Sequence, residues 1–82
     1  MNGFYIVKKY IDECDYMSLL SFGAPADEYD IESRYICKLI NNKCSVEEIA
    51  QVIADTFSQY FGNPEKAESF MAVAEKIKAD LK

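Results

Sequence analysis

The sequence predicts an all-α fold, a compact bundle of about four helices over residues 3–13, 27–41, 46–61 and 64–80, with one long ordered loop over about 14–26. Three observations predict this class. Apolar residues recur at intervals of three and four rather than two, as on one face of a helix. Capping residues stand at the ends of these stretches. The chain has 82 residues, half of them hydrophobic, which is enough for one small domain and too short for two.

The first helix, over about 3–13, is predicted from apolar residues at intervals of 3, 4 and 3: Phe4, Val7, Ile11 and Cys14. The segment that follows has no regular period and contains Gly23 and Pro25. Its Met17, Leu19 and Phe22 are too apolar for a disordered linker, so we expect an ordered loop that tucks under the bundle.

The second helix, over about 27–41, is predicted from apolar residues that cover a broad arc: Ile31, Tyr35, Ile36, Leu39 and Ile40. The polar run Asn41-Asn42-Lys43 predicts its end and the following loop.

The third helix begins at a capping box, Ser45-Val46-Glu47-Glu48, in which serine and glutamate side chains each bond the other's backbone amide. One apolar stripe then runs to the end of the helix and predicts its buried face: Val46, Ile49, Ala50, Ile53, Phe57, Tyr60 and Phe61. Gly62 predicts the left-handed residue at which the helix ends.

The fourth helix is predicted to start directly afterwards, with Asn63 as its N-cap and Pro64 at its first position. Its predicted buried face follows the helical spacing: Ala67, Phe70, Met71, Ala74, Ile77 and Leu81.

Composition argues against several functions. The chain has no histidine, which removes Ser–His and Cys–His catalytic pairs and imidazole metal ligands. Its net charge of −5 disfavours nucleic-acid binding, which needs a basic face. Cys14, Cys37 and Cys44 are odd in number and irregularly spaced, as in a cytoplasmic protein with free thiols. No apolar stretch is long enough for a membrane span, so we expect a cytoplasmic protein without membrane contact.

The negative charge is concentrated in the first part of the chain. Residues 1–32 hold 7 acidic and 2 basic side chains, whereas residues 33–82 hold 7 of each. We expect a binding surface for a basic protein partner within residues 12–32, made of the acidic residues and the two tyrosines embedded among them: Asp12, Glu13, Asp15, Tyr16, Asp27, Glu28, Tyr29, Asp30 and Glu32.

Helix-end electrostatics offers a simpler account of part of this charge. Asp27, Glu28, Asp30 and Glu32 complement the positive N-terminal end of the second helix. Asp12, Glu13 and Asp15 instead crowd the unfavourable end of the first helix, which indicates a use elsewhere. Catalysis by paired carboxylates would need a cleft, and the calcium-loop and di-metal patterns are incomplete, so no catalytic residue, metal or cofactor is expected.

Two segments, Asp15-Tyr16-Met17-Ser18-Leu19-Leu20 and Gly23-Ala24-Pro25-Ala26-Asp27-Glu28-Tyr29-Asp30-Ile31-Glu32, resemble the signature of a small bacterial all-helical family catalogued as a domain of unknown function. The likeness spans about residues 10–80, and Phe57-Ser58-Gln59-Tyr60-Phe61-Gly62 is similar in kind. Tyr16 departs from the pattern, because the family usually has proline there. The resemblance implies a compact helical fold and a cytoplasmic bacterial protein, and it carries over no catalytic residue.

We therefore expect a non-enzymatic protein-binding domain. Its most concrete form is an immunity or inhibitor protein that covers a basic partner, such as a nuclease-type toxin domain, with its 12–32 surface. By analogy of class, small acidic bacterial proteins are often encoded beside toxins. The alternative is a structural or regulatory module that self-associates through apolar helix faces, and the protein itself is expected to be a monomer or a weak homodimer.

Overall fold

The computed structural model describes residues 3–14, 23, 29–62 and 64–81, and over these residues the protein is all-α, as predicted. Four α-helices and one short 3₁₀ helix follow in order: α1 (Gly3–Cys14), α2 (Asp30–Leu39), α3 (Val46–Phe61), η1 (Ala67–Phe70) and α4 (Met71–Asp80). No strand occurs in the described parts of the chain. None of the helices described is long and apolar enough to cross a bilayer.

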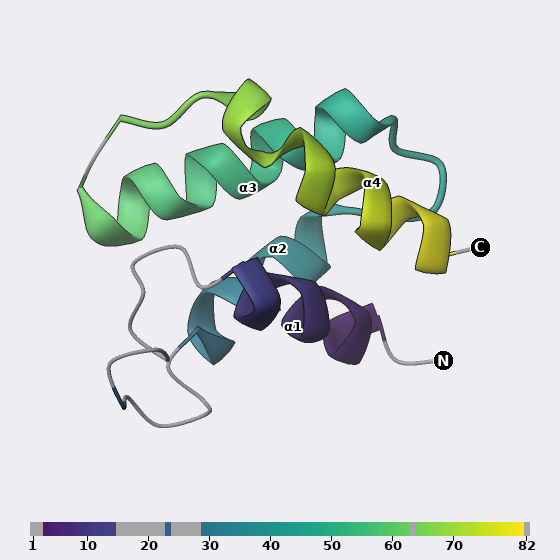
Figure 1. Ribbon diagram of the computed structural model, residues 1–82, viewed down its shortest axis with the longest axis horizontal. Helices are drawn as coiled ribbons and strands as arrows, with labels where there is room; N and C mark the ends of the chain where they lie inside the picture. The colour runs from purple at the N-terminus through teal and green to yellow at the C-terminus, as the bar shows by residue number, and fades with distance from the viewer. Residues whose placement is uncertain (1–2, 15–22, 24–28, 63, 82) are drawn as a thin grey trace.

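The helices pack as two pairs. In Figure 1, α1 lies in front of α2, and α3 and α4 lie above them. The start of α1 and the end of α4 lie on the same side of the molecule, since a side chain at Gly3 would meet both Cys37 of α2 and Leu81. The core between the pairs is made of fully or almost fully buried apolar residues: Val7, Ile11, Tyr29, Ile36, Ile49, Ala50, Ile53, Ala54, Phe57, Phe70, Ala74 and Ile77.

The ends of α3 are as predicted. The Ser45 hydroxyl accepts from the Glu48 amide at 3.1 Å, and the Glu48 carboxylate accepts from the Ser45 amide at 2.8 Å. At the other end, Gly62 has a φ of 75° and donates its amide to the Ser58 carbonyl. A residue without a side chain adopts this left-handed conformation at low cost, so the helix stops here.

The predicted fourth helix is wrong in its first part. Residues 64–66 are not helical, and Lys66 is extended, with φ −111° and ψ 145°. The Glu65 amide donates instead to the Ser58 hydroxyl at 2.9 Å, which ties this segment to the last turn of α3. A 3₁₀ turn then brings Phe70 into the core against Phe57, with ring centroids 5.5 Å apart, and α4 starts only after it. Asn63, the predicted N-cap, lies outside the described residues.

The second helix is shorter than predicted. It begins at Asp30, after Tyr29 in a turn conformation, and it ends at Leu39, because Ile40 is extended with ψ 160°. Of the predicted loop over 14–26, the structure describes Cys14, which is the last residue of α1, and Gly23, whose φ of 94° is left-handed.

The predicted buried faces hold for most of α3 and α4. Of the five residues in the apolar arc predicted for the second helix, only Ile36 is fully buried. Ile31 is 65% exposed and Leu39 is 51% exposed. Tyr60 of α3, also predicted to be buried, is 42% exposed. The apolar arc of α2 is therefore wider than the surface that its neighbours cover.

Candidate interaction surface

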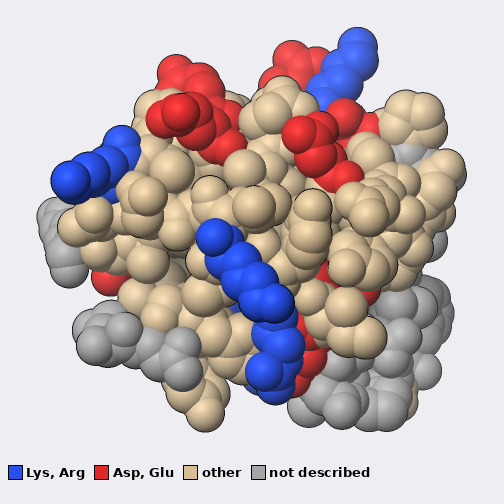
Figure 2. Space-filling model, turned by 180° about the vertical axis from the view of Figure 1, so that it is seen from behind, with Lys and Arg blue, Asp and Glu red and all other residues tan. Residues whose placement is uncertain are grey.

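The predicted acidic surface is described in part. Asp15, Tyr16, Asp27 and Glu28 lie outside the described residues, so the structure places only the other members: Asp12, Glu13, Tyr29, Asp30 and Glu32. Acidic and basic side chains occur together on the face of the molecule shown in Figure 2, with Lys and Arg side chains crossing its centre.

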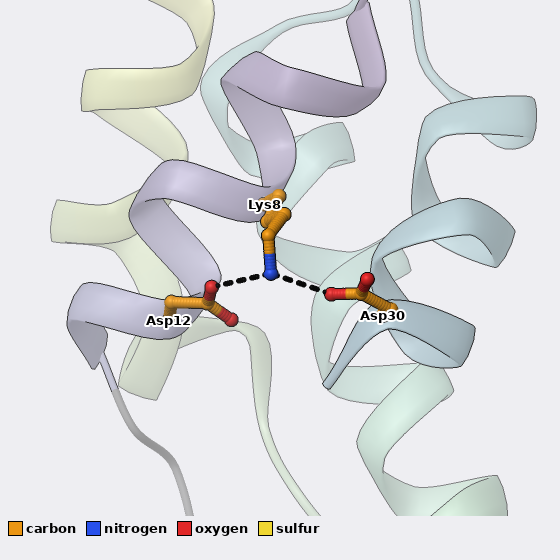
Figure 3. A network of polar contacts seen from close by, with 3 residues as sticks. All are labelled: Lys8, Asp12 and Asp30. Carbon is orange, nitrogen blue, oxygen red and sulfur yellow. Dashed lines mark hydrogen bonds and ion pairs between the residues drawn. The ribbon is translucent and has the colours of Figure 1, made fainter. Parts of the chain in front are cut away.

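Asp12 and Asp30 share one lysine. Lys8 of α1 donates to Asp12, one turn further along the same helix, at 2.9 Å and to Asp30 at the start of α2 at 2.6 Å (Figure 3). The hydrogen bonds with Asp30 and then Asp12 raise the pKa of Lys8 above its ordinary value, because both favour the charged ammonium. These two carboxylates thus hold α1 against α2, and their charge is partly neutralised.

Glu13 also has a basic partner. Lys76 of α4 donates to Glu13 at 2.9 Å, and the hydrogen bond raises the pKa of Lys76. Both side chains are more than half exposed, so the pair contributes little stability, but it places a positive charge beside Glu13. Next to it, the Tyr10 hydroxyl donates to Asp80 at 2.6 Å and joins α1 to α4 a second time.

Tyr29 and Glu32 lie inside the protein, which corrects their placement on a binding surface. Tyr29 is fully buried, with its ring edge-on to Phe57 and to Phe61 at centroid distances of 6.3 Å each. Glu32 is 7% exposed. Glu32 lies on the side of α2 that packs against its neighbours, where Ile36 also lies, and Tyr29, directly before the first residue of α2, packs its ring into the same core. Neither residue as placed here can anchor a partner at the surface.

The exposed side of α2 carries a different set of residues. Ile31, Tyr35 and Leu39 are spaced by four and therefore form one stripe along the helix. Tyr35, the half-buried middle residue of this stripe, contacts Tyr60 of α3 edge-on, with ring centroids 5.9 Å apart. Arg34 and Lys38, also exposed and four residues apart, flank the stripe. We call these five residues of α2, together with Tyr60, the α2 face.

The two cations of the α2 face border a hollow between α1 and α2. The hollow measures about 310 Å³ and is lined by Phe4, Arg34, Cys37 and Lys38. The Arg34 guanidinium carbon lies 4.8 Å from the centre of the Phe4 ring, which is a cation–π contact between α2 and α1. Over the described parts of the chain, no ion pair joins Arg34 or Lys38 to a carboxylate.

Elsewhere in the described parts of the chain, the candidates for a site are a second hollow and the possible metal ligands. A second hollow, of about 390 Å³, lies between α4 and the start of α3 and is lined by Asn42, Val46, Glu75, Lys78 and Ala79. Lys78 is already used there, since it donates to the Cys44 carbonyl at 2.5 Å. No group of three potential metal-binding side chains gathers among the described residues.

The fold and this surface define a class: a small all-α bundle with one incompletely covered helix. Comparison of the chain with protein-family models, with curated proteins and with solved structures finds no match.

Sequence reasoning missed the α2 face, although one signal for it was present. Arg34 and Lys38 share the helix face of the Ile31 stripe, and such a face is more often solvated than buried. The Lys8–Asp12 pair also has the i, i+4 spacing of a helix ion pair, which is visible in the sequence.

Proposed function

We propose that this protein is a non-catalytic protein-binding domain that docks its partner through the α2 face. The single observation that carries this proposal is the exposure of Ile31 and Leu39, two large aliphatic side chains on one stripe of a helix, with Tyr60 beside them. Exposed apolar residues that cluster, rather than occur singly, mark interaction sites on small soluble proteins. The tyrosine and arginine in the same surface are the residue types enriched in interfaces.

We also propose that the protein works in a reducing compartment such as the bacterial cytoplasm. Cys14, Cys37 and Cys44 all carry free thiols and are all partly exposed. Free thiols of this kind persist where disulfides are kept reduced.

A second candidate is the docking of a basic protein, such as a nuclease-type toxin domain, by the acidic residues of 12–32. Its support is the charge distribution, with an excess of five negative charges in residues 1–32 and none in residues 33–82. Against it, Asp12, Glu13 and Asp30 each have a lysine partner, and Tyr29 is buried. This candidate depends on Asp15, Tyr16, Asp27 and Glu28.

The experiment that tests the α2 face uses two purified variants as baits in extracts of the native host. Ile31→Ser combined with Leu39→Ser removes the two exposed aliphatic side chains of the stripe, and Tyr5→Ser is the matched control, because Tyr5 is a large residue of α1 that is 67% exposed and is not part of the α2 face. A partner identified by mass spectrometry is then purified and titrated against each bait.

We expect the wild type and Tyr5→Ser to bind the purified partner equally and the double variant to lose at least about tenfold in affinity, as for two buried aliphatic anchors. A purified partner that binds the double variant as well as the wild type contradicts the proposal. If its binding is instead abolished by reversing Asp27 and Glu28, the second candidate is correct.

A further inference from the structure

The α2 face combines apolar and basic side chains, and this combination restricts the partner. The stripe of Ile31, Tyr35 and Leu39 runs the length of α2, with Arg34 and Lys38 along one side. The protein as a whole carries a net charge of −5, yet Arg34 and Lys38 place two positive charges one turn apart on this side of α2. Among the described residues, neither forms an ion pair with a carboxylate. Asp30, one turn before Arg34, is bonded to Lys8.

From this arrangement we infer that the α2 face binds an acidic amphipathic helix of another protein. The apolar side of such a helix would pack on Ile31, Tyr35 and Leu39, whose spacing of four matches the apolar stripe of an amphipathic helix. Its carboxylates would meet Arg34 and Lys38 at the hollow between α1 and α2. The inference rests on the proposed function and adds the charge and the shape of the partner.

The Arg34 side chain is preorganised for this contact. The cation–π contact with Phe4, 4.8 Å from the guanidinium carbon to the ring centre, restrains Arg34 before any partner arrives, which lowers the entropy lost on binding. A guanidinium can bind a carboxylate with two parallel hydrogen bonds, which a lysine ammonium cannot do. Lys38, one turn further on, supplies a second positive charge on the same side of the helix.

A second copy of this chain fits the α2 face less well. A two-fold pair places the same surface of each copy against itself. In an antiparallel pair of α2 helices, Arg34 and Lys38 of one copy would approach the same two cations of the other. The repulsion between these charges, which nothing else on the α2 face neutralises, disfavours self-association and favours an acidic partner.

The test is a selection of displayed random peptides of helix length on the whole immobilised protein. Enriched peptides are synthesised, and their affinities are measured by fluorescence anisotropy at low and high salt. The charge variant is Arg34→Glu with Lys38→Glu. The control is Lys9→Glu with Lys66→Glu, which makes the same charge change at two exposed lysines outside the α2 face. Circular dichroism establishes that each variant is folded.

We expect the enriched peptides to carry Asp or Glu beside apolar residues at helical spacing. Their affinity should fall about tenfold in the charge variant and at high salt, and remain unchanged in the control. Exchanging the acidic residues of a peptide for lysine should restore binding to the charge variant.

Three results would overturn the inference, and they differ in what they say about the proposed function. Peptides that require Ile31 and Leu39 but are not enriched in Asp or Glu refute the claim that the partner is acidic. They leave the α2 face as the docking site. Peptides that bind the Ile31→Ser, Leu39→Ser variant as well as the wild type refute both, as does a selection that enriches nothing.

Discussion

Lys8 and Asp30 are 22 positions apart in the sequence, yet the Lys8 ammonium lies 2.6 Å from the Asp30 carboxylate, and the same ammonium bonds Asp12. The pair joins the middle of α1 to the first residue of α2 (Figure 3). A carboxylate there also complements the positive end of the α2 dipole. Two of the acidic residues expected to face a partner thus hold the fold together.

Replacing Lys8 by methionine should destabilise the protein by about 1 kcal/mol, because Asp12 and Asp30 would then face each other without a cation in a partly buried site. For a domain of this size the melting temperature should fall by about 4–8 °C. Lys9→Met is the control, since Lys9 is exposed and its side chain lies over the Tyr10 ring. Equal melting temperatures for the two variants would show that the bridge contributes nothing.

The stability should fall at alkaline pH, and Lys8 should account for part of the fall. Its pKa in the folded protein is raised above the ordinary value of 10.5 by the bonds to Asp30 and Asp12. The stabilisation is therefore complete below about pH 10.5 and is lost as the pH rises through the folded pKa. The bond to Asp80 raises the pKa of Tyr10 in the same direction, which adds to the loss.

Urea unfolding of the wild type and of Lys8→Met, measured between about pH 9 and 12, checks this prediction. The free energy of unfolding should decline less steeply in the variant. Parallel declines in the two proteins would assign the whole effect to other groups.

Tyr29→Ala should cost about 3–5 kcal/mol, because it removes a fully buried ring that packs against Phe57 and Phe61. Tyr5→Ala, at an exposed position, should change the stability by less than about 0.5 kcal/mol. Chemical denaturation distinguishes the two. A small effect at Tyr29 would place this tyrosine at the surface, as the sequence had suggested.

Replacement by alanine should lower the free energy of unfolding much more at Ile36 than at Ile31. Ile36→Ala should cost about 2–5 kcal/mol, whereas Ile31→Ala should cost less than about 0.5 kcal/mol, because only Ile36 is buried. The comparison keeps residue type and helix constant and is made by thermal unfolding. A large loss at Ile31 would mean that the α2 face is covered in the free protein.

Loss of the capping-box serine should lower the free energy of unfolding by about 1 kcal/mol. Ser45→Ala leaves the Glu48 amide without its acceptor at the start of α3. Glu48→Ala removes the reciprocal bond, and because the two bonds form one unit, the double variant should lose less than the sum of the single losses. Strict additivity in a denaturation cycle would argue that the two bonds act independently.

The order and the class of the helices could be predicted from the sequence because their signals are local. The capping box of α3, Gly62 and the stripe from Ile49 to Phe57 involve residues within one or two turns of each other. The start of α4 could not be predicted in the same way. There the Ser58 hydroxyl and the burial of Phe70 against Phe57 prevail over the favourable local signals of Pro64 and Glu65.

The surface was harder to predict, since it depends on which elements meet. Helical spacing places the apolar residues Ile31 and Leu39 on one face of α2, but it does not say how much of that face the neighbouring helices cover. The Lys76–Glu13 pair joins residues 63 positions apart, so charge counted along the chain overstates the charge of the folded surface. Tyr29 stands in an acidic run, yet the packing of α2 turns it inward.

The most direct test of the α2 face is a nitrogen–proton correlation NMR titration of the labelled protein with an acidic peptide from the selection. We expect the largest shift changes at Ile31, Arg34, Tyr35, Lys38 and Leu39, with a further change at Tyr60. Shift changes centred on α4, or on residues 12–28, with α2 unaffected, would contradict this expectation.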